Sequence, residues 1–550
     1  MSGKRKWITM GILSAVVASL VLAGCSPSGN PGDSSAASGQ TAMQTGDKEL
    51  TIAIYRDGEM DMLDAATYKG PHVMYKMLYE GLVEDGGKNG IQPQLATSWN
   101  ISEDGKTYTF HLREGVKFSD GTDFNADAVC FNLARWVNND RHASLTSYAV
   151  ESYRAVDEHT VEIVFKEGSY PILTELTYPR PVRFLSPSSI EKVEGDVMGK
   201  FTKPVGTGQW MLESYTPEQE FVLVPNPYYW GEKPALNKIT FKVIPDGQAR
   251  IMALQSGEVD IIGGDLLGKI SLEGVQELQN SGQWNIQQNT TMNAYYMGFS
   301  QGNPVLQDVK VRQAINYAID KESMVSNMFY GIGSPAKGMY DTSVPYVTEE
   351  NSPGYAYDLE KAKSLMSEAG YTDSNGDGFA EDKNGENITL KLVLTTEENP
   401  EWKPMAEYVQ SELAKIGLKV DLETLDTNAY NEVSMTTLDY DLIFQRTSSD
   451  SWLPHGDMKI LFTPLSVAQN RARVWYDEDL IQTIQSTMNQ QDETKRQEGY
   501  DKIFRKINDE ALVVPLYYPM TTFAMNDKVA NFEFGVNSYD AINWTKLSTK

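Results

Sequence analysis

The sequence predicts an α/β protein built from at least two lobes. Patterns of strands and helices alternate from Lys238 onward, which is typical of layered α/β folds. Once the N-terminal segment is set aside, roughly 500 residues remain, more than the ~250–300 that one hydrophobic core usually serves. A mean hydropathy of −0.41 and 10% aromatic residues indicate a globular chain rather than a membrane-embedded one.

The N-terminus has the pattern of a secretion signal. A basic cluster, Lys4 to Lys6, precedes an apolar run from Trp7 to Leu22 that is short for a membrane span. The run ends in Leu22-Ala-Gly-Cys25, which resembles a bacterial lipobox. The resemblance implies cleavage after residue 24 and a diacylglycerol on Cys25, and several acyl chains anchor a protein stably. The alternative is an ordinary secretory signal that contains a cysteine. Residues 25–47 are Ser-, Gly- and Ala-rich, which is typical of a flexible tether.

Charge and cysteine usage narrow the class of protein. Removing Lys4, Arg5 and Lys6 leaves 45 basic against 75 acidic residues, a net charge of −30. Such a surface repels nucleic acid. Besides Cys25 there is one cysteine, Cys130, so we expect no disulfide framework. Cys130 adjoins apolar helix positions and is expected to be a small buried hydrophobe.

In the first half of the chain the patterns predict mostly strands. A helix is expected to end at Gly81, a turn at Gly105, and a helix to begin after the cap Asn125. The helix that ends at Gly81 is expected to begin at residue 68. The other expected elements are strands at 49–55 and 107–112, a hairpin at 156–165 and a strand pair after 206–210.

In the second half strands and helices alternate. Expected strands are 239–244, 259–262, 294–299, 418–425, 439–445 and, as the final one, 512–518. Expected helices are 248–256, 309–320 (with Val311, Ile315, Ala318 and Ile319 inward), 359–369, and one with Met405, Val409, Leu413 and Ile416 on its apolar stripe.

No catalytic set is readable. The five histidines show no His-Glu-x-x-His spacing, and there is no Gly-x-Ser-x-Gly elbow. The loop Asp373–Gly378 matches the first half of a calcium loop, but its twelfth position is Asn384 instead of a bidentate Glu. A surface turn is therefore the favoured interpretation, and a secreted hydrolase or calcium-dependent enzyme is the disfavoured class.

One stretch, Leu95 to Val129, carries a family resemblance. Its tight turn, its Leu112–Phe118 run and its Asn125-Ala-Asp helix start occur together and in order. The stretch resembles the signature of bacterial extracellular solute-binding proteins of family 5, which serve peptide and nickel ABC importers. The likeness covers nearly all of residues 48–548, including the helix at 309–320.

The resemblance implies a two-lobed, hinged fold of the periplasmic-binding-protein type. It places lobe I at residues 48–288 plus 518–550 and lobe II at 289–517, with the ligand cleft between them. It also implies a monomeric binding protein rather than an enzyme, with an ABC permease as its partner.

Two arginine contexts point to a carboxylate ligand. Prolines 179 and 181 fix the backbone around Arg180, so its guanidinium is held ready for bidentate capture of a carboxylate. An inter-loop salt bridge is the alternative on these residues alone. The passages around Arg141-His142 and around Arg180 resemble the nickel-uptake branch, in which the matching arginines bind carboxylates of a metal chelate. There the metal's ligands come mostly from a small molecule such as histidine or an opine-like metallophore.

The matching segment of the second lobe is Phe444 to His455. By resemblance Trp452 would stack on the ligand, while Ser451 stands where peptide-binding members carry an Asp for the peptide's amino terminus. Ser144 and Ser448 replace tryptophans of nickel-type members, which indicates a roomier pocket. The further candidates for ligand or metal binding are His142, His455 and Arg446, although a core or loop role is the default for both histidines.

These observations predict a lipid-anchored substrate-binding protein on the outer face of the bacterial cytoplasmic membrane. Its expected cargo is a nickel (or related transition-metal) chelate, delivered to an importer, and it needs no cofactor of its own. The alternative is an oligopeptide or dipeptide receptor on the same scaffold.

Overall fold

The computed structural model describes residues 48–58, 60–67, 72–137, 145–179, 183–397, 399–447, 454–466, 469–537 and 540–550. Three larger sheets organise these residues, and each has its own buried apolar cluster. The mixture of sheets and helices agrees with the predicted α/β class.

The first large sheet has seven strands in the order β10-β11-β12-β1-β13-β23-β14. β1 pairs in parallel with β12, with Ile52 opposite Phe241, and both side chains are fully buried. Helix α4 (Gly247–Ser256) connects β12 to β13, as the alternating pattern predicts, and α5 (Leu272–Ser281) precedes β14. The strands are β1 (Glu49–Ile54), β10 (Trp210–Thr216), β11 (Glu220–Pro225), β12 (Lys238–Val243), β13 (Ile261–Gly263), β14 (Asn285–Thr290) and β23 (Met520–Met525).

A four-stranded antiparallel sheet, β4-β5-β7-β6, packs against helix α2 (Ala126–Val137). Asn125 caps this helix as predicted, because its Oδ1 accepts the Ala128 N–H at 3.1 Å. The prediction for Cys130 is wrong, since its side chain is only half-buried. Val129 and Leu133 share the buried stripe, whereas Cys130 lies about 100° further round the helix. The strands are β4 (Ala96–Ile101), β5 (Thr107–Leu112), β6 (Val150–Asp157) and β7 (Thr160–Phe165).

Short elements join these two sheets. Helix α1 (His72–Leu78) ends three residues before the predicted stop at Gly81. The helix cannot continue because Glu80 forms a β-bridge with Phe184 and Gly81 accepts a backbone hydrogen bond from Leu95. The remaining elements here are β2 (Val83–Asp85), β3 (Ile91–Pro93), α3 (Ile172–Glu175), β8 (Ile190–Val193) and β9 (Asp196–Phe201).

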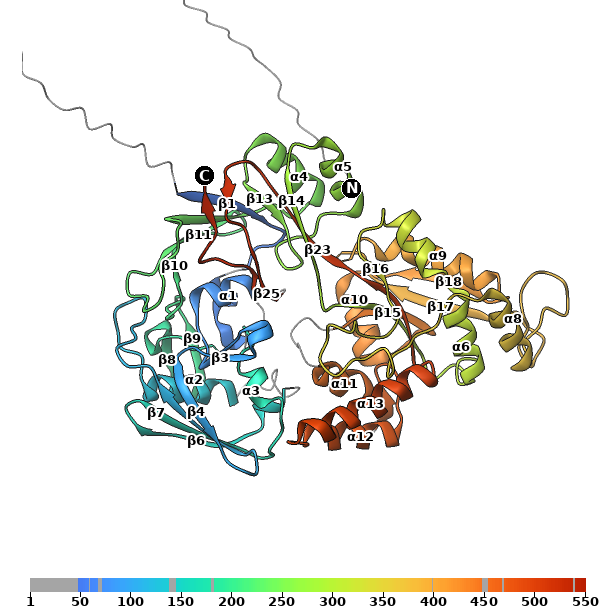
Figure 1. Cartoon of the computed structure of the whole chain (residues 1–550), viewed down its shortest axis with the longest axis horizontal. Helices are drawn as coiled ribbons and strands as arrows, with labels where there is room; N and C mark the ends of the chain where they lie inside the picture. Colours follow the sequence, from blue (N-terminus) through green and yellow to red (C-terminus); the bar gives the residue numbers. More distant parts are fainter. Residues whose placement is uncertain are drawn as a thin grey trace, which may run out of the picture. The chain divides into compact units, whose positions relative to one another are not determined.

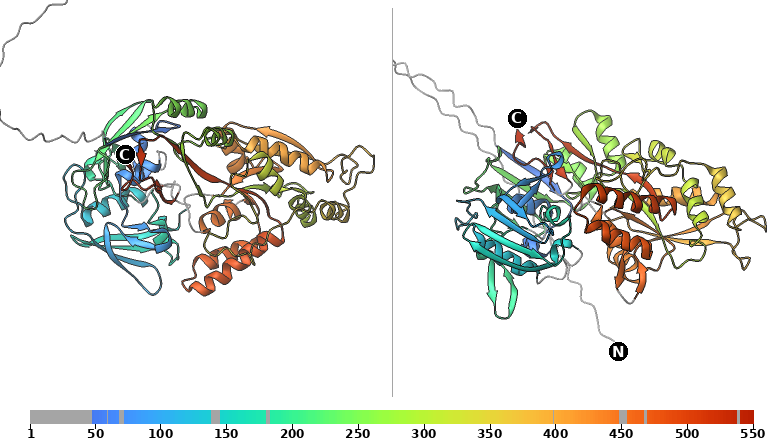
Figure 2. Two further views of the ribbon diagram at one scale, coloured as in Figure 1. Left: turned by 45° about the horizontal axis from the view of Figure 1, so that its top comes forward. Right: turned by 60° about the horizontal axis from the view of Figure 1, so that its bottom comes forward.

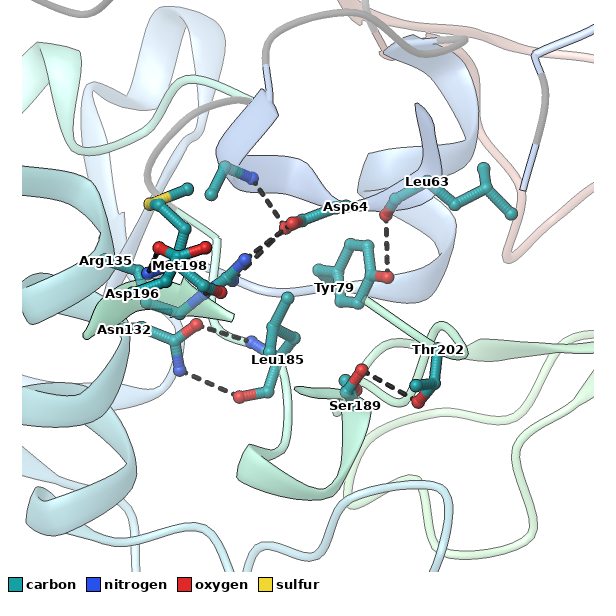
Figure 3. A network of polar contacts seen from close by, with 11 residues as sticks. Leu63, Asp64, Tyr79, Asn132, Arg135, Leu185, Ser189, Asp196, Met198 and Thr202 are labelled. Carbon is teal, nitrogen blue, oxygen red and sulfur yellow. Dashed lines mark hydrogen bonds and ion pairs between the residues drawn. The ribbon is translucent and has the colours of Figure 1, made fainter. Parts of the chain in front are cut away.

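A buried ion pair ties α2 to the N-terminal segment beside the seven-stranded sheet. Arg135 Nη2 lies 2.6 Å from Asp64 Oδ2, and a second guanidinium nitrogen donates to Oδ1 at 3.2 Å (Figure 3). Arg135 also donates to the Met198 carbonyl at 3.0 Å. A bidentate pair of this kind fixes both distance and orientation. We refer to the seven- and four-stranded sheets together as the first lobe.

The third sheet forms the second lobe. It has six strands in the order β16-β22-β15-β19-β17-β18 and carries the largest buried apolar cluster of the described chain. The positions predicted to face inward in α6 (Val309–Ala318) and α9 (Trp402–Ala414), or within two residues of their ends, are all buried. Its strands are β15 (Tyr295–Phe299), β16 (Ser334–Pro335), β17 (Thr389–Leu394), β18 (Lys419–Thr424), β19 (Leu442–Arg446) and β22 (Val513–Tyr518).

Helices pack around the six-stranded sheet of the second lobe. α6 packs on α8, and α12 and α13 lie side by side (Figure 2). Among the described residues, no helix combines the length and the apolar character needed to cross a membrane. The elements are α6 (Val309–Ala318), α7 (Lys321–Ser323), α8 (Leu359–Glu368), α9 (Trp402–Ala414), α10 (Thr427–Glu432), α11 (His455–Phe462), β20 (Pro464–Ser466), β21 (Gln469–Ala472), α12 (Glu478–Met488) and α13 (Glu493–Asp509).

The chain passes between the lobes twice, from β14 to β15 and from β22 back to β23 (Figure 1). The two crossings are hydrogen-bonded to each other, since Thr291 Oγ1 donates to the Pro519 carbonyl at 3.0 Å. The prediction that residues 512–518 form the final strand is wrong. β23 follows and is held by pairing with β13 and β14, and after it come β24 (Val529–Ala530), β25 (Phe534–Asn537), β26 (Asp540–Ile542) and β27 (Ser548–Thr549).

Candidate functional site between the lobes

Most of the predicted site residues lie outside the described residues. This holds for Cys25, Arg141, His142, Arg180 and Trp452. For Arg141, His142, Arg180 and Trp452 the structure describes the chain before and after the gap in which they lie, and it also describes Arg446 and His455. The site is therefore built here from the described residues that bridge the lobes and line the cavities beside them.

A second arginine, Arg183, is the residue at which the described chain resumes after Arg180. Arg183 is 3% exposed, and its guanidinium donates to the Thr177 carbonyl at 2.6 Å and to Gln94 Oε1 at 3.2 Å. Burial lowers the pKa of Arg183 to about 10, while the nearby carboxylates Glu84, Asp540 and Glu80 oppose that shift. The Arg183 guanidinium is thus buried and engaged by groups of the protein itself.

His455 lies at the N-terminus of α11 and contacts the first lobe. Its Nε2 is 3.0 Å from Glu175 Oε1, and both side chains are 1% exposed. Glu175 ends α3 and also accepts the backbone N–H groups of Thr146 and Ser147 at 3.0 and 2.6 Å. In this arrangement the Nε2 of His455 is occupied by an inter-lobe contact, while its buried Nδ1 has no partner among the described residues.

A tyrosine cluster makes a second inter-lobe contact. Tyr170, in the loop before α3, shares a 2.6 Å hydroxyl–hydroxyl hydrogen bond with Tyr500 of α13. The Arg496 guanidinium lies 4.2 Å above the Tyr170 ring, and the Tyr346 ring meets that ring edge-on. Ser169 adds a 2.9 Å hydrogen bond to Asn489. Together these contacts dock the loop at residues 168–171 onto α12 and α13.

A polar network connects the lobes near the crossings. Lys269, in the loop after β13, donates to the Tyr295 hydroxyl at 2.5 Å and to Asn399 Oδ1 at 3.0 Å. The Tyr295 hydroxyl in turn donates to Glu401 Oε1 at 2.7 Å. Burial raises the pKa of Tyr295 well above its ordinary value, and the Glu401 charge adds to this, so the phenol stays neutral as a donor.

Two cavities adjoin Arg446. The first, the inter-lobe cavity, has a volume of about 410 Å³ and takes its lining from both lobes, including Arg56 and Lys269 of the first and Glu397 and Arg446 of the second. The second, here named the Trp402 cavity, has a volume of about 300 Å³, and its described lining comes from the second lobe alone. Two of the predicted site residues are described by the structure. Arg446 lines both cavities, whereas His455 is buried in a contact between the lobes.

The calcium-like loop is a surface turn. Asp373 accepts the backbone N–H groups of Gly376 and Gly378 at 2.6 and 2.9 Å, and Glu381 accepts those of Ser374 and Asn375. The carboxylates therefore stabilise the turn itself. In the described parts of the chain, no group of three or more His, Cys, Asp or Glu side chains is arranged to hold a metal ion.

Sequence reasoning missed Glu175, Tyr170, Lys269 and Trp402. A glutamate at the end of a four-residue helix, or a tyrosine in a loop, carries no local signal of a partner hundreds of residues away. Trp402 is the first residue of α9 and precedes the predicted apolar stripe, which begins at Met405. Such a stripe indicates burial without indicating a neighbouring cavity.

Comparison with known proteins gives the class. The family model for bacterial extracellular solute-binding proteins, family 5 (middle region), matches residues 90–468. The chain is 32% identical over 469 residues to the nickel-binding periplasmic protein of Escherichia coli K12, covering 84% of this chain and 88% of that protein. It is 29% identical over 465 residues to the dipeptide-binding protein of the same organism, covering 79% and 82%.

Among solved structures, NikA from Brucella suis in complex with Fe(III)-EDTA superposes with a TM-score of 0.83 at 29% identity, covering 92% of this chain and all of that one. The fold is thus that of a two-lobed extracytoplasmic binding protein. The chain belongs to the family 5 bacterial extracellular solute-binding proteins. It is a substrate-binding protein for an ABC transporter, and the family's role is binding for transport rather than catalysis.

Proposed function

We propose that this protein captures a chelate of nickel, or of a related transition metal, and delivers it to the permease subunits of an ABC importer. The observation that carries the proposal is the likeness to the nickel-binding periplasmic protein along 84% of the chain. The likeness to NikA with a bound Fe(III)-EDTA adds support, because that ligand is a metal already wrapped in a carboxylate chelator.

In this proposal the chelate lies between lobe I (48–288 with 518–550) and lobe II (289–517). Arg141 and Arg180 of lobe I bind the chelator's carboxylates, and Trp452 of lobe II covers the chelate. Arg446 supports this placement, because it lies at the cavities beside the cleft. His142 and His455 are the histidines nearest in sequence to these residues. His455 contributes through its Glu175 contact rather than through the metal.

The chelator supplies most metal ligands, for which histidine or an opine-like metallophore is suitable. The protein then needs to recognise carboxylates and shape, a task for guanidinium groups and aromatic rings. The metal is cargo here and not a resident cofactor.

The protein acts as a monomer at the outer face of the cytoplasmic membrane, held there by a lipid on Cys25. The apolar run followed by Leu22-Ala-Gly-Cys25 supports this part of the proposal.

The test is calorimetric titration of the purified protein with nickel–histidine, with nickel alone, and with a mixture of dipeptides, beside native mass spectrometry of protein taken from rich medium. We expect saturable binding of nickel–histidine and a retained mass that fits a metal chelate. Binding of dipeptides with no response to the chelate would instead establish the peptide receptor.

The peptide receptor is the second candidate because the dipeptide-binding protein of Escherichia coli is 29% identical over 79% of the chain. Ser451, standing where peptide binders carry an aspartate, argues against it, since an amino terminus would lose its ion-pair partner.

A further inference from the structure

The Trp402 cavity holds buried polar atoms that no described residue satisfies. Trp402 is 2% exposed, Gln445 4% and Thr395 5%, and all three line the cavity. Trp402 Nε1, Gln445 Nε2 and Thr395 Oγ1 each lack a hydrogen-bond partner among the described residues. A buried polar group left without a partner costs roughly 1–3 kcal/mol. Two N–H donors and one hydroxyl in this state, on residues that line one cavity, indicate a place for a ligand's acceptor atoms.

The orientation of the Gln445 amide is set by a neighbour. Its Oε1 accepts the Tyr296 hydroxyl at 2.8 Å, which leaves the Nε2 donors without a partner among the described residues. Burial raises the pKa of Tyr296 well above its ordinary value, so this hydroxyl remains a donor. The unpartnered groups are therefore mainly donors, and they match a ligand that offers oxygen acceptors.

The charged residues that line the Trp402 cavity also favour a ligand with oxygen acceptors. Its described lining includes Arg446 and Arg473, with Asp457 as the one carboxylate among those described residues. Asp457 already accepts the Tyr340 hydroxyl at 2.8 Å, and Arg473 is oriented by a long, 3.4 Å contact to the Ser434 carbonyl. The described lining thus contains more guanidinium groups than carboxylates, in a chain whose net charge is −27.

We infer that the Trp402 cavity binds a carboxylate-bearing arm of the ligand, separate from the carboxylates that Arg141 and Arg180 would hold. The inference rests on the proposed function and narrows its substrate class: the cargo is a polycarboxylate chelate with an arm that reaches into the second lobe. A volume of about 300 Å³ accommodates such an arm, and side pockets of this size are within the range of ligand sites.

The first test is calorimetry with cobalt(III)–ethylenediaminetetraacetate, a diamagnetic, inert chelate with four carboxylate arms. Gln445→Glu keeps the acceptor for Tyr296 but replaces the donors with a negative charge, so we expect binding about tenfold or more weaker. Trp402→Phe removes one neutral donor, and we expect about a fivefold loss.

Trp210→Phe is the matched control. The Trp210 indole is 1% exposed and its Nε1 also lacks a partner in the described chain, but Trp210 belongs to β10 in the first lobe. Its substitution removes the same kind of buried donor away from the cavity, and we expect unchanged chelate affinity.

The second test reads the cavity directly. Indole ¹⁵N–¹H resonances are recorded on the full chain, with Trp402 assigned by its loss in Trp402→Phe. Saturating chelate should move the Trp402 resonance downfield as its N–H begins to donate, and leave that of Trp210 in place. A Trp402 resonance that stays fixed with chelate bound, or equal affinity of wild type and Gln445→Glu, overturns the inference.

The two proposals fail separately. If wild type binds no metal chelate, the proposed function is wrong, and metal-free citrate then serves as the probe of the cavity. A downfield shift of the Trp402 resonance with citrate, abolished in Gln445→Glu, supports the carboxylate pocket by itself. No shift with citrate overturns it.

Discussion

Glu175 Oε1 and His455 Nε2 are 3.0 Å apart and join α3 of the first lobe to α11 of the second. Burial alone would raise the pKa of Glu175, but the hydrogen bond and charge of His455, together with the Ser147 N–H, hold it below its ordinary value. The carboxylate is thus kept ionised although its side chain is only 1% exposed. Because the pair joins the two lobes, the free energy of unfolding depends in part on the contact between them.

Glu175→Ala should destabilise the protein by roughly 3–5 kcal/mol at pH 7, because it leaves His455 and two backbone N–H groups without their buried acceptor. Glu175→Gln, which can still accept from Ser147, should lose less. The folded pKa is depressed, so the stabilisation is present above the unfolded value of about 4.3 and is lost as pH falls further. Thermal unfolding at pH 7 and at pH 3.5 checks this. A gap between wild type and Glu175→Gln that stays as wide at low pH would contradict it.

Glu80→Gln should stabilise the protein in alkaline solution. Burial raises the pKa of Glu80 from 4.5 to about 7, against the Trp230 hydrogen bond that favours the charged form. Since the folded pKa is raised, the free energy of unfolding is highest below pH 4.5. It declines by up to about 3 kcal/mol as the pH rises from 4.5 through 7. Gln keeps an acceptor for the Trp230 indole, now 2.9 Å away, and carries no charge. Unfolding temperatures at pH 5 and 8.5 should show a smaller decline for Glu80→Gln than for wild type; parallel declines would refute this assignment.

Ligand should draw the lobes together. The contacts of Tyr170 with Tyr500 and of Glu175 with His455 lie between the lobes, and a hinged receptor makes such contacts on closing. Small-angle scattering should give a smaller radius of gyration with saturating nickel–histidine than without it. Identical profiles, at a concentration where calorimetry proves binding, would count against closure.

Arg180→Ala should weaken nickel–histidine binding by about ten- to a hundredfold, because a charge-assisted hydrogen bond contributes roughly 1.5–3 kcal/mol. Arg180→Lys should recover little, since an ammonium group cannot make the two parallel bonds. Bare nickel has no carboxylate and should bind poorly to both proteins. If wild type and Arg180→Ala bind both forms equally, the arginine is structural. Arg183, whose guanidinium is engaged by Thr177 and Gln94, is unsuitable as a control because its loss would loosen the loop itself.

Cys25→Ala should release the protein from the membrane fraction or leave it unprocessed, because the thiol that would carry the lipid is gone. Fractionation of cells with mass spectrometry of the N-terminal peptide checks this. A variant that still partitions with membranes and shows an unchanged acylated N-terminus would remove the lipobox interpretation.

The sequence alone determined the features of this protein that depend on residues close together in the chain. The Asn125 cap, the turn at Gly105 and the inward stripe of α6 depend on residues within a few positions of each other, and the structure confirms each. The ordered motif between Leu95 and Val129 was likewise enough to indicate the family, which the comparisons establish. By contrast, the predicted ligand residues Arg141, Arg180 and Trp452 stay predictions.

Tertiary structure decided what depends on distant partners. The end of α1 is set by the pairing of Glu80 with Phe184, and β23 exists through its pairing with β13 and β14. The same holds for Glu175 with His455, 280 residues apart. Periodicity reports that one face of an element is buried, but it cannot say which remote element covers that face. Periodicity also cannot show where the packed elements leave a cavity, as they do beside Trp402.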